Sequence, residues 1–313
     1  MTRQAPQRTR LWKRVPKGLS KHAAIIWNVD AERVLASLPK AALWDLVVTS
    51  PPYNLGKHYE TKQGLEDYAK WHEAIIAKLV TRLKPSGSLC WQIGNYVENG
   101  SIAPLDYIFH PIFLKHGLKL RNRVIWRYGH GMHQRRRFSG RYEVVLWYTK
   151  SNDYTFNLDA VRIPPKYPGK RAYKGPNAGK FSSHPMGKNP EDVWEVPAAD
   201  IDVWDIPNVK ASHVEKTGHP CQFPVGLVER LVLALSNEGD LVFDPFAGVG
   251  SAGVAAAIHQ RRFWGCEIDE AYAQLAKARI DGALSGKMRF RSHARPLYDH
   301  RTSPMSVRRD QIA

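Results

Sequence analysis

Two short stretches of the chain combine residue types that could bind small polar ligands. The first is "LVFDPFAGVGSAGVAAA", in which an apolar run is followed by Asp244 and then by Gly248 and Gly250. Glycines let the backbone turn tightly and approach a ligand at the carboxyl end of a strand. The next apolar run, "FWGCEI", ends in Glu267, where a carboxylate can accept hydrogen bonds from a ribose diol. Together these residues predict a nucleotide-type site.

The residues around the glycine loop separate three classes of nucleotide ligand. A phosphate-binding NTPase loop ends in Gly-Lys-Ser/Thr, but this loop ends in Gly-Ser-Ala at positions 250–252. The spacing of Gly248, Gly250 and Gly253 fits a dinucleotide site. Asp244 ahead of the loop, however, would repel a pyrophosphate and attract a cationic amino-acid group. S-adenosylmethionine carries such a group together with a ribose and an adenine, so the pattern favours this cofactor.

The second stretch is "VVTSPPYN", where an apolar strand ends at Ser50 and is followed by two prolines and Tyr53. Each proline fixes its own φ and lacks a backbone donor, so the carbonyls here stay available as acceptors. An exocyclic amino group on a base needs acceptors for both hydrogens if its lone pair is to point at an electrophile. Ser50 Oγ and the Pro51 carbonyl could accept them. Tyr53 offers a flat face for a base removed from its duplex stack.

Alternating apolar segments predict the elements that must position these residues. Strands are expected at "AAIIW", "LWDLVVTS", "SLCWQIGN", "LKLRNRVIWRYG", "YEVVLWYTK", "DLVF" and "RRFWGCEID". Helices are expected at "DAERVLASLP", "PLDYIFHPIFLKHG", "FPVGLVERLVLALS", "EAYAQLAKARIDGAL" and at "LEDYAKWHEAIIAKLVTRLKPSG", which Pro85 and Gly87 would close. The alternation is typical of an α/β fold with a mostly parallel, doubly wound sheet. Tyr167 to Asp192 breaks it and predicts an irregular insert.

Composition narrows the class of partner. The 313 residues carry a formal net charge of +17, which favours a polyanion as ligand. No apolar run is long enough to span a bilayer and no signal peptide is visible, which argues against a membrane partner. Cys90, Cys221 and Cys266 are widely spaced and fit no zinc or disulfide framework, so no metal site is expected. These features predict a soluble protein of a reducing compartment.

Taken together, the two stretches resemble the amino-group DNA methyltransferases, which methylate N4 of cytosine or N6 of adenine. Members carry an (Asp/Asn/Ser)-Pro-Pro-(Tyr/Phe) catalytic motif and an Asp-Pro-Phe-x-Gly-x-Gly cofactor motif. This chain has Ser-Pro-Pro-Tyr at 50–53 and Asp-Pro-Phe-Ala-Gly-Val-Gly at 244–250. The catalytic motif precedes the cofactor motif, which is similar to the beta ordering within the family. The resemblance covers roughly residues 23–284.

The resemblance implies a Rossmann-like, S-adenosylmethionine-dependent methyltransferase fold and methylation of N4 of a flipped cytosine in double-stranded DNA. The serine form of the catalytic motif is more usual for N4-cytosine enzymes and the aspartate form for N6-adenine enzymes, so adenine is the alternative. "HPCQFPVGLVERLV" resembles the segment over the methionine end of the cofactor, while Asn28 stands where the family usually has glycine. The implied catalytic residues are Ser50, Pro51, Pro52 and Tyr53, and the implied cofactor-binding residues are Asp30, Asp244, Pro245, Phe246, Gly248, Gly250, Glu267, His219, Pro220, Gln222 and Phe223.

Basic residues outside these motifs are expected to contact DNA phosphates. Many cluster in "WRYGHGMHQRRRFSGRYE", and the region that follows lies where relatives of this motif order carry target recognition. The predicted DNA contacts are Arg127, His130, His133, Arg135, Arg136, Arg137, Arg141, Lys170, Arg171 and Lys174. The predicted divisions are a basic arm (1–22), a catalytic half (23–149), a target-recognition region (150–217), a cofactor-binding half (218–284) and a basic tail (285–313).

Other classes explain less of the sequence. A Rossmann oxidoreductase that uses NAD would account for the glycines and Glu267 but not for the Ser-Pro-Pro-Tyr turn. A non-enzymatic DNA-binding protein would not need the cofactor loop, and an RNA or protein methyltransferase is the nearest rival. Cys221 in "HPCQF" is similar to the nucleophile segment of cytosine-C5 enzymes, but it precedes the glycine loop and is expected to be buried or to cap a helix. The preferred interpretation is a cytoplasmic enzyme of a restriction-modification system, encoded by a prokaryote or carried by a phage or plasmid. A cognate endonuclease is a possible partner, and both a monomer and a homodimer fit.

Overall fold

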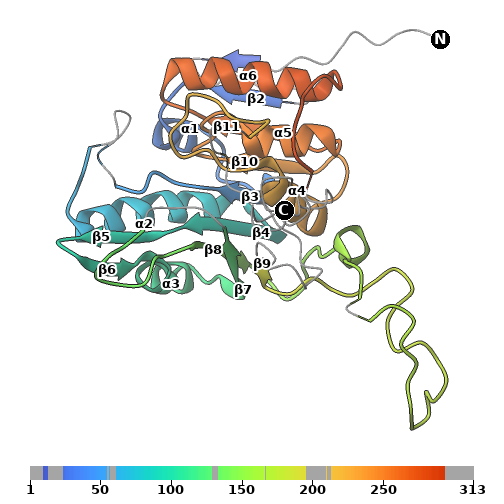
Figure 1. Ribbon diagram of the computed structural model, residues 1–313. Helices are drawn as coiled ribbons and strands as arrows, with labels where there is room; N and C mark the ends of the chain where they lie inside the picture. The colour runs from blue at the N-terminus through green and yellow to red at the C-terminus, as the bar shows by residue number, and fades with distance from the viewer. Residues whose placement is uncertain are drawn as a thin grey trace, which may run out of the picture.

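A computed structural model of the chain has a central sheet with helices packed on both of its faces (Figure 1). Within the described residues, no helix is long and apolar enough to cross a membrane. The structure describes residues 10–12, 24–54, 56, 61–128, 133–165, 167–194, 209 and 213–292.

The central sheet has nine strands in the described part of the chain, in the order β1-β2-β11-β10-β3-β4-β8-β7-β9. Only β8 runs against its two neighbours, β4 and β7, and every other neighbouring pair is parallel. This confirms the mostly parallel sheet. The strands are β1 (Arg10–Trp12), β2 (Ala24–Trp27), β3 (Trp44–Thr49), β4 (Leu83–Ile93), β7 (Lys119–Arg127), β8 (Tyr142–Thr149), β9 (Val193–Trp194), β10 (Leu241–Asp244) and β11 (Arg262–Cys266).

Side chains that alternate along the strands build a separate apolar core on each face of the sheet. In β2, Ile25 and Trp27 join the core under α1 (Ala31–Ser37), α2 (Leu65–Arg82) and α3 (Leu105–Lys115). Ala24 and Ile26 point the other way, toward α4 (Val225–Leu235), α5 (Ser251–Ile258) and α6 (Glu270–Leu284). Successive residues of a strand face opposite sides, and both faces of β2 are buried, so this strand is apolar throughout. The sheet is therefore doubly wound, as predicted.

The predicted motif residues meet at one edge of this sheet. The strands β2, β11, β10 and β3 are neighbours and parallel, so their carboxyl ends lie side by side. Asp30 follows β2, Glu267 follows β11, Asp244 ends β10 and Ser50 follows β3. The residue at the end of a strand in such a sheet faces the crevice where ligands bind.

Two elements differ from the sequence-based expectation. The basic segment 1–22 is expected to be an arm, yet Arg10–Trp12 forms β1, which pairs in parallel with Ile25–Trp27. Main-chain pairing with a buried neighbour, rather than its own apolar pattern, accounts for this strand. A hairpin, β5 (Asn95–Glu98) and β6 (Ser101–Pro104), turns through Asn99 and Gly100, both with positive φ. Asn-Gly is the residue pair that this type of hairpin turn prefers.

The end of α2 also differs from the expectation. The helix ends at Arg82, and β4 begins at Leu83, whose backbone is extended (φ −69°, ψ 130°). Pro85 and Gly87 therefore lie in the first part of the strand instead of closing the helix. Proline tolerates this position because its φ is compatible with extended backbone.

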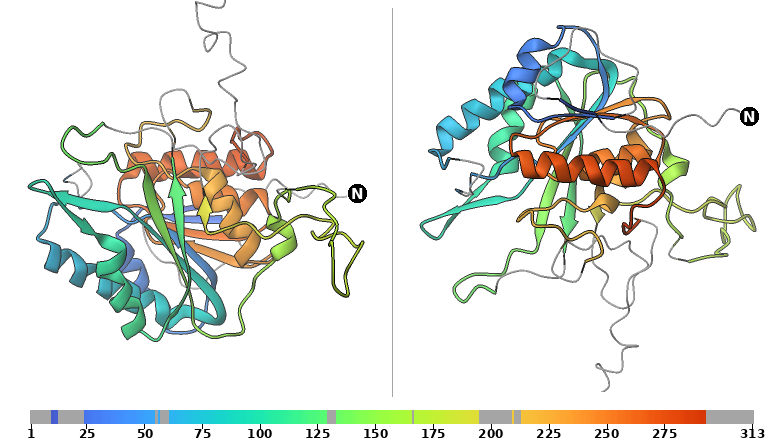
Figure 2. Two further views of the ribbon diagram at one scale, coloured as in Figure 1. Left: turned by 60° about the horizontal axis from the view of Figure 1, so that its bottom comes forward. Right: turned by 90° about the horizontal axis from the view of Figure 1, so that it is seen from above.

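The described part of residues 150–192 projects from the body on one side (Figure 2), and within it residues 167–192 are irregular, as predicted. It holds a short 3-10 helix, η1 (Leu158–Val161), and isolated bridges such as Ile163 with Lys188 and Arg171 with Phe181. Residues 285–292, the first part of the expected basic tail, include residues that pack against the body. Met288 and Phe290 pack against the core under α4 to α6, and the Arg291 amide donates to Glu215 Oε1 at 3.0 Å.

Candidate active site

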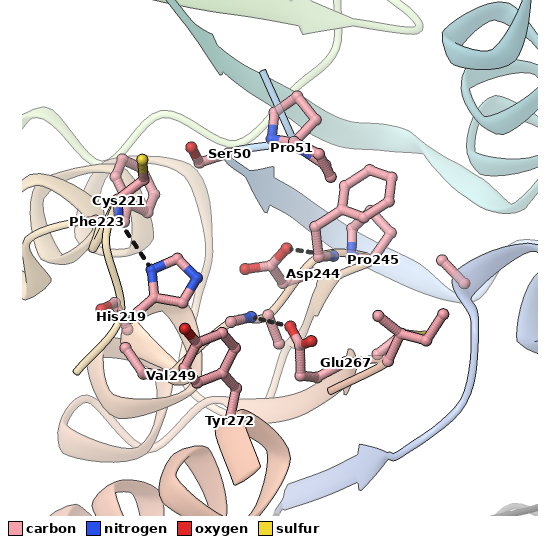
Figure 3. Close-up of a pocket in the computed structure, with 18 of the residues that line it drawn as sticks. Ser50, Pro51, His219, Cys221, Phe223, Asp244, Pro245, Val249, Glu267 and Tyr272 are labelled. Carbon is pink, nitrogen blue, oxygen red and sulfur yellow. Dashed lines mark hydrogen bonds between the residues drawn. The ribbon is translucent and has the colours of Figure 1, made fainter. Parts of the chain in front are cut away.

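A cleft opens where β2, β11, β10 and β3 end, and Figure 3 shows the side chains that line it. It encloses about 1060 Å³, its open mouth included. Ser50 and Pro51 lie at one end of the cleft and Glu267 at the other, with Asp244 between them (Figure 3). All of the predicted catalytic and cofactor-binding residues line it except Pro220 and Gly250.

A hydrogen bond in the floor of the cleft joins the two sequence motifs. The Thr49 hydroxyl, at the end of β3, donates to Asp244 Oδ1 at 2.6 Å, and the Phe246 amide donates to the same oxygen at 3.0 Å. Thr49 and Asp244 are both buried. Burial raises the pKa of Asp244 to about 7, although both hydrogen bonds oppose the shift. A cation in the cleft would offset this cost, since it favours the ionised carboxylate.

Glu267 is fixed by two main-chain donors. The Gly248 amide donates to Oε2 at 2.9 Å and the Asp269 amide to Oε1 at 2.8 Å, and burial raises the pKa of Glu267 to about 7. An ionised carboxylate has about four acceptor sites, so it can still accept bonds from a ligand diol. The Asn28 side chain donates to the carbonyls of Glu267 and Ile268 at 3.0 Å each. It ties the end of β2 to the loop after β11.

Asp30 caps the first turn of α1 as well as lining the cleft. Its Oδ1 accepts from the amides of Glu32 at 2.8 Å and Arg33 at 3.4 Å. An N-terminal cap of this kind fixes the direction of the side chain and stabilises the helix. The carboxylate is therefore held at the rim of the cleft.

The two glycines of the loop have different tasks. Gly248 lines the cleft with a positive φ of 51° and presents its amide to Glu267. Gly250 has a φ of 77°, precedes α5 and does not line the cleft. A Cβ at position 250 would lie 2.9 Å from the Cβ of Ala276 on α6. Gly250 is thus required by the turn and by the close packing of α6, not by contact with a ligand.

The segment before α4 forms one wall of the cleft. Glu215, buried behind it, accepts from the Val225 amide at 3.0 Å. The Gln222 side chain donates to the Glu215 carbonyl at 2.7 Å and accepts from the Thr217 hydroxyl at 2.8 Å. Gln222 therefore holds the wall in shape with its amide already engaged. The His219 ring lies edge-on to the ring of Tyr272, with centroids 4.6 Å apart.

Cys221 corrects one expectation. The sequence predicts a buried or helix-capping cysteine, but Cys221 is exposed and lies on the wall of the cleft. Its amide donates to His219 Nδ1 at 3.2 Å, which keeps this segment turned along the mouth (Figure 3). Cys221 lies in the segment before α4, which begins at Val225, so it is not part of the helix.

The opposite end of the cleft holds a network of polar side chains. Ser50 Oγ lies 3.2 Å from the Tyr53 hydroxyl, which donates to Gln92 Oε1 at 2.6 Å and lies 3.3 Å from Glu143 Oε2. The Gln92 amide also donates to Glu143 Oε2. Burial raises the pKa of Glu143 to about 7 and raises that of Tyr53 well above its ordinary value.

Three further hydrogen bonds hold the Ser-Pro-Pro-Tyr turn in place. The Tyr68 hydroxyl on α2 donates to the Pro52 carbonyl at 2.5 Å. The Asn54 side chain is buried at a positive φ of 59° and exchanges two hydrogen bonds, both 2.7 Å, with the backbone of Gln63. Asparagine is one of the few residues that adopt this backbone conformation readily. The turn is therefore anchored on both sides of Tyr53.

The predicted DNA-binding residues lie outside the cleft. Arg127 ends β7, the residues from His133 to Arg141 form the loop before β8, and residues 170–174 lie in the irregular insert. The loop and the insert project from different sides of the body in both views of Figure 2. Arg171 is engaged within the insert, where its guanidinium stacks over Phe181 at 4.3 Å. His130 lies outside the described residues.

The cleft also contains residues that were not among the predicted site residues, although most lie within or beside the stretches that carry the motifs. Tyr272 and Ile268 follow the strand of Glu267 and could have been expected from that position. Trp71 comes from the middle of α2 and reaches the cleft because its ring packs 5.4 Å from that of Phe246. The remaining lining residues of this kind are Val29, Ala31, Ala247, Val249, Ser251 and Cys266, with Cys221 considered only as an alternative nucleophile.

The two ends of the cleft suit two different ligands. Asp30, Asp244 and Glu267 gather negative charge in a chain of net charge +17, which favours a cationic ligand with a diol. Ser50 and Tyr53 present hydroxyl groups, and Pro51 presents a proline turn, at the other end. The residues therefore fit the ammonium, ribose and adenine of S-adenosylmethionine, with a polar acceptor molecule bound beside it.

Comparison with known sequences places the chain in a family. The model of the DNA methylase family N6_N4_Mtase matches residues 44–278. The type II methyltransferase M.BglII of Bacillus subtilis is 42% identical over 270 residues, which are 86% of this chain and 72% of that protein. The DNA adenine methyltransferase YhdJ of Escherichia coli is 31% identical over 273 residues, which are 86% of each chain.

Comparison with solved structures agrees with the fold and the cofactor. The modification methylase TTHA0409 of Thermus thermophilus, described as putative and complexed with S-adenosyl-L-methionine, is 25% identical. The match covers 90% of this chain and 95% of that one, with a TM-score of 0.58. S-adenosyl-L-methionine is thus the cofactor of this methyltransferase. The chain belongs to the N6/N4 family of DNA methylases, enzymes that methylate amino groups of DNA bases at specific sites.

Proposed function

We propose that this enzyme methylates the exocyclic N4 of a cytosine flipped out of duplex DNA, within a restriction-modification system. The observation that carries the proposal is the anchored Ser-Pro-Pro-Tyr turn, which opens onto the same cleft as the acidic cofactor end. The choice of cytosine is supported by Ser50, because the serine form of this motif is more usual among N4-cytosine enzymes. The alternative is N6 of adenine, which the name of the relative YhdJ favours.

The cofactor end of the cleft is assigned to S-adenosylmethionine. Asp244 and Glu267 would accept hydrogen bonds from its polar groups, and Asp30 and Phe246 would flank it, together with His219, Gln222 and Phe223 on the opposite wall. The bound cofactor supplies an electrophilic methyl group on a sulfonium sulfur. The carboxylates provide negative charge near this cation, and the packed aromatic rings of Trp71 and Phe246 restrict the access of water.

The residues of the turn orient the amino group. Ser50 Oγ and the Pro51 carbonyl accept its two hydrogens, which directs the nitrogen lone pair toward the methyl group. Oxygen acceptors also stabilise the positive charge that grows on the nitrogen as the new bond forms. The Tyr53 ring provides a stacking face for the base. The hydrogen bond from its hydroxyl to Gln92 Oε1, at 2.6 Å, holds the ring in one orientation. Positioning of this kind supplies most of the rate when little acid-base chemistry is needed.

The basic loop and the insert are assigned to DNA. Residues 150–217 would form the target-recognition region, and the exposed side chains of Lys170 and Lys174 lie on its projecting part. The loop before β8 carries His133, Arg135 and Arg136. Strand β8 itself contains Glu143, near the base end of the cleft. Contacts with phosphates from both segments would hold the duplex while one base enters the cleft. A cognate restriction endonuclease is the partner expected from this function.

Incubation of a long unmethylated duplex of mixed sequence with labelled S-adenosylmethionine tests the proposal. After digestion to nucleosides, we expect the label in N4-methylcytosine, and a matched reaction with Ser50→Ala should give very little. Label in N6-methyladenine would move the function to the alternative. An absence of labelled nucleoside, with cofactor binding intact by titration, would exclude both.

A further inference from the structure

Glu143 is a carboxylate at the base end of the cleft that no sequence motif identifies. It lies in β8, next to Val144, which pairs with Ile93 of β4. Gly94 follows the last residue of β4, and a Cβ at Gly94 would lie 3.5 Å from the Glu143 side chain. Gln92 and Glu143 are diagonal neighbours on the same face of this antiparallel pair, so their side chains meet. The register of the strands therefore brings the carboxylate behind Tyr53.

A continuous series of hydrogen-bonding groups connects this carboxylate with the cleft. Ser50 Oγ is 3.2 Å from the Tyr53 oxygen, and the Tyr53 oxygen is 3.3 Å from Glu143 Oε2. The Gln92 side chain bridges the same two residues, because it accepts from Tyr53 and donates to Glu143. Ser50 also lines the cleft, whereas Glu143 does not. The hydrogen-bonded route from Glu143 to the cleft therefore runs through Tyr53 and Ser50.

The groups that surround Glu143 are mostly neutral. Gln92 on β4, Tyr53 after β3 and Tyr128 after β7 all hydrogen-bond to it. The charged Arg141, which precedes β8, acts electrostatically on Tyr128, while Tyr68 and Cys221 act on Tyr53. Burial raises the pKa of Glu143 to about 7, so the carboxylate can exchange a proton near neutral pH. An ordinary surface glutamate would be fully ionised there and a poor proton acceptor.

We propose that Glu143 orients Tyr53 and Ser50 and takes up, through them, the proton that the methylated amino group must lose. This inference rests on the proposed amino-group methylation. When the amino nitrogen bonds to the methyl carbon, the carbon–sulfur bond breaks and its electron pair stays on sulfur, which leaves the nitrogen with one extra proton. Ser50 Oγ accepts that proton and passes its own to Tyr53, and Tyr53 passes its proton to Glu143. The product is a neutral methylamino base and a protonated Glu143, which later releases the proton to solvent.

Glu143→Gln tests this assignment, since it keeps the shape and a hydrogen-bonding oxygen but cannot accept a proton. At saturating cofactor and duplex, we expect the single-turnover rate of the wild type to rise with pH and level off above about 7, the pKa of Glu143. The variant should lose on the order of 100-fold at pH 8, at the lower end of general-base effects, and its profile should be flat. Tyr53→Phe, which interrupts the series but leaves Glu143 in place, should flatten the profile in the same way.

Controls separate proton uptake from a structural role and from failure of the proposed function. Glu98 lies on the β5–β6 hairpin and forms an exposed ion pair with Lys62. Glu98→Gln removes this carboxylate and should keep the wild-type rate and pH profile. Cofactor and duplex dissociation constants of Glu143→Gln should match those of the wild type. A wild-type rate and profile in Glu143→Gln would overturn the inference, and so would a uniform loss of rate that keeps the pH profile. If the wild type methylates no base, the proposed function itself fails.

Discussion

The two ends of the cleft carry different kinds of polar side chain. At the cofactor end, Asp244 and Glu267 are carboxylates fixed by main-chain amides and by the Thr49 hydroxyl. At the base end, the groups nearest the cleft are the hydroxyls of Ser50 and Tyr53, and the carboxylate of Glu143 lies one residue further back. The carboxylates of Asp244 and Glu267 therefore lie directly beside the proposed cation site. The carboxylate of Glu143 is separated from the proposed amino-group site by other side chains.

In the proposed function, this difference would let one cleft bind a cation tightly and still leave an amino nitrogen nucleophilic. A carboxylate beside the bound cofactor strengthens binding in both the ground state and the transition state, so it raises affinity more than rate. Neutral acceptors that orient the amino group act mainly as the new bond forms, so they raise rate more than affinity. The predictions below separate these two effects.

Ser50→Ala should produce the largest change. Loss of one oriented acceptor should lower the single-turnover rate on the order of 100-fold, comparable to the loss of one preorganised contact in other enzymes. The cofactor dissociation constant, measured by calorimetric titration, should stay unchanged because Ser50 lies at the base end. A collapse of cofactor binding with the saturated rate preserved would show that Ser50 is assigned to the wrong end.

Glu267→Gln should have the opposite effect. Removal of the charge should weaken cofactor binding by about tenfold, the equivalent of one charge-assisted hydrogen bond. The rate at saturating cofactor should stay close to that of the wild type. Glu238→Gln, an exposed position in the turn before β10, is the matched control and should change neither quantity. A variant with normal affinity and a low saturated rate would assign Glu267 to the chemistry instead.

The pH dependence of cofactor binding should follow from the same carboxylates. Because the pKa values of Asp244 and Glu267 are raised to about 7, binding of a cation must displace protons below that pH. Affinity should therefore increase from pH 6 to 8 and then level off, with at most about tenfold per pH unit for each group. Glu267→Gln should show a shallower increase, and a pH-independent affinity in the wild type would contradict the account.

The same pKa shifts determine the stability of the protein without cofactor. Between the ordinary pKa of 4.5 and the raised value of about 7, the folded state keeps a proton on Glu267 that the unfolded chain has lost. The contribution of this group to the free energy of unfolding therefore decreases as pH rises through that range. Denaturant titrations of wild type and Glu267→Gln at pH 5 and pH 7 measure the difference, which should favour the variant at pH 7.

Cys221→Ala should have the smallest effect. Cys221 is exposed on the wall of the cleft and donates a hydrogen bond to His219 through its backbone amide, which alanine retains. The methylation rate should change by less than about twofold, the range of most surface substitutions. Complete loss of activity with normal folding would instead support a thiol nucleophile and reaction at C5 of cytosine.

The cofactor end was predictable from sequence because its parts are local. Asp244, Gly248 and Glu267 each follow an apolar run, and the rule that strand ends meet at one edge brings them together. The base end was only half predictable. Ser50 and Tyr53 belong to one short motif, but Gln92 and Glu143 meet through the antiparallel pairing of β4 with β8, whose register no local pattern specifies. Strand β1 was missed for a similar reason, since its stability comes from its neighbour.

A double-mutant cycle of Ser50→Ala and Glu267→Gln tests the central claim most directly. The measured quantity is the ratio of single-turnover rate to cofactor dissociation constant for the wild type, both single variants and the double variant. If the two ends act independently, the free-energy losses should add to within about 0.5 kcal/mol. A coupling energy above about 1 kcal/mol would mean that the two residues serve one interaction, which would contradict a cleft with separate tasks at its two ends.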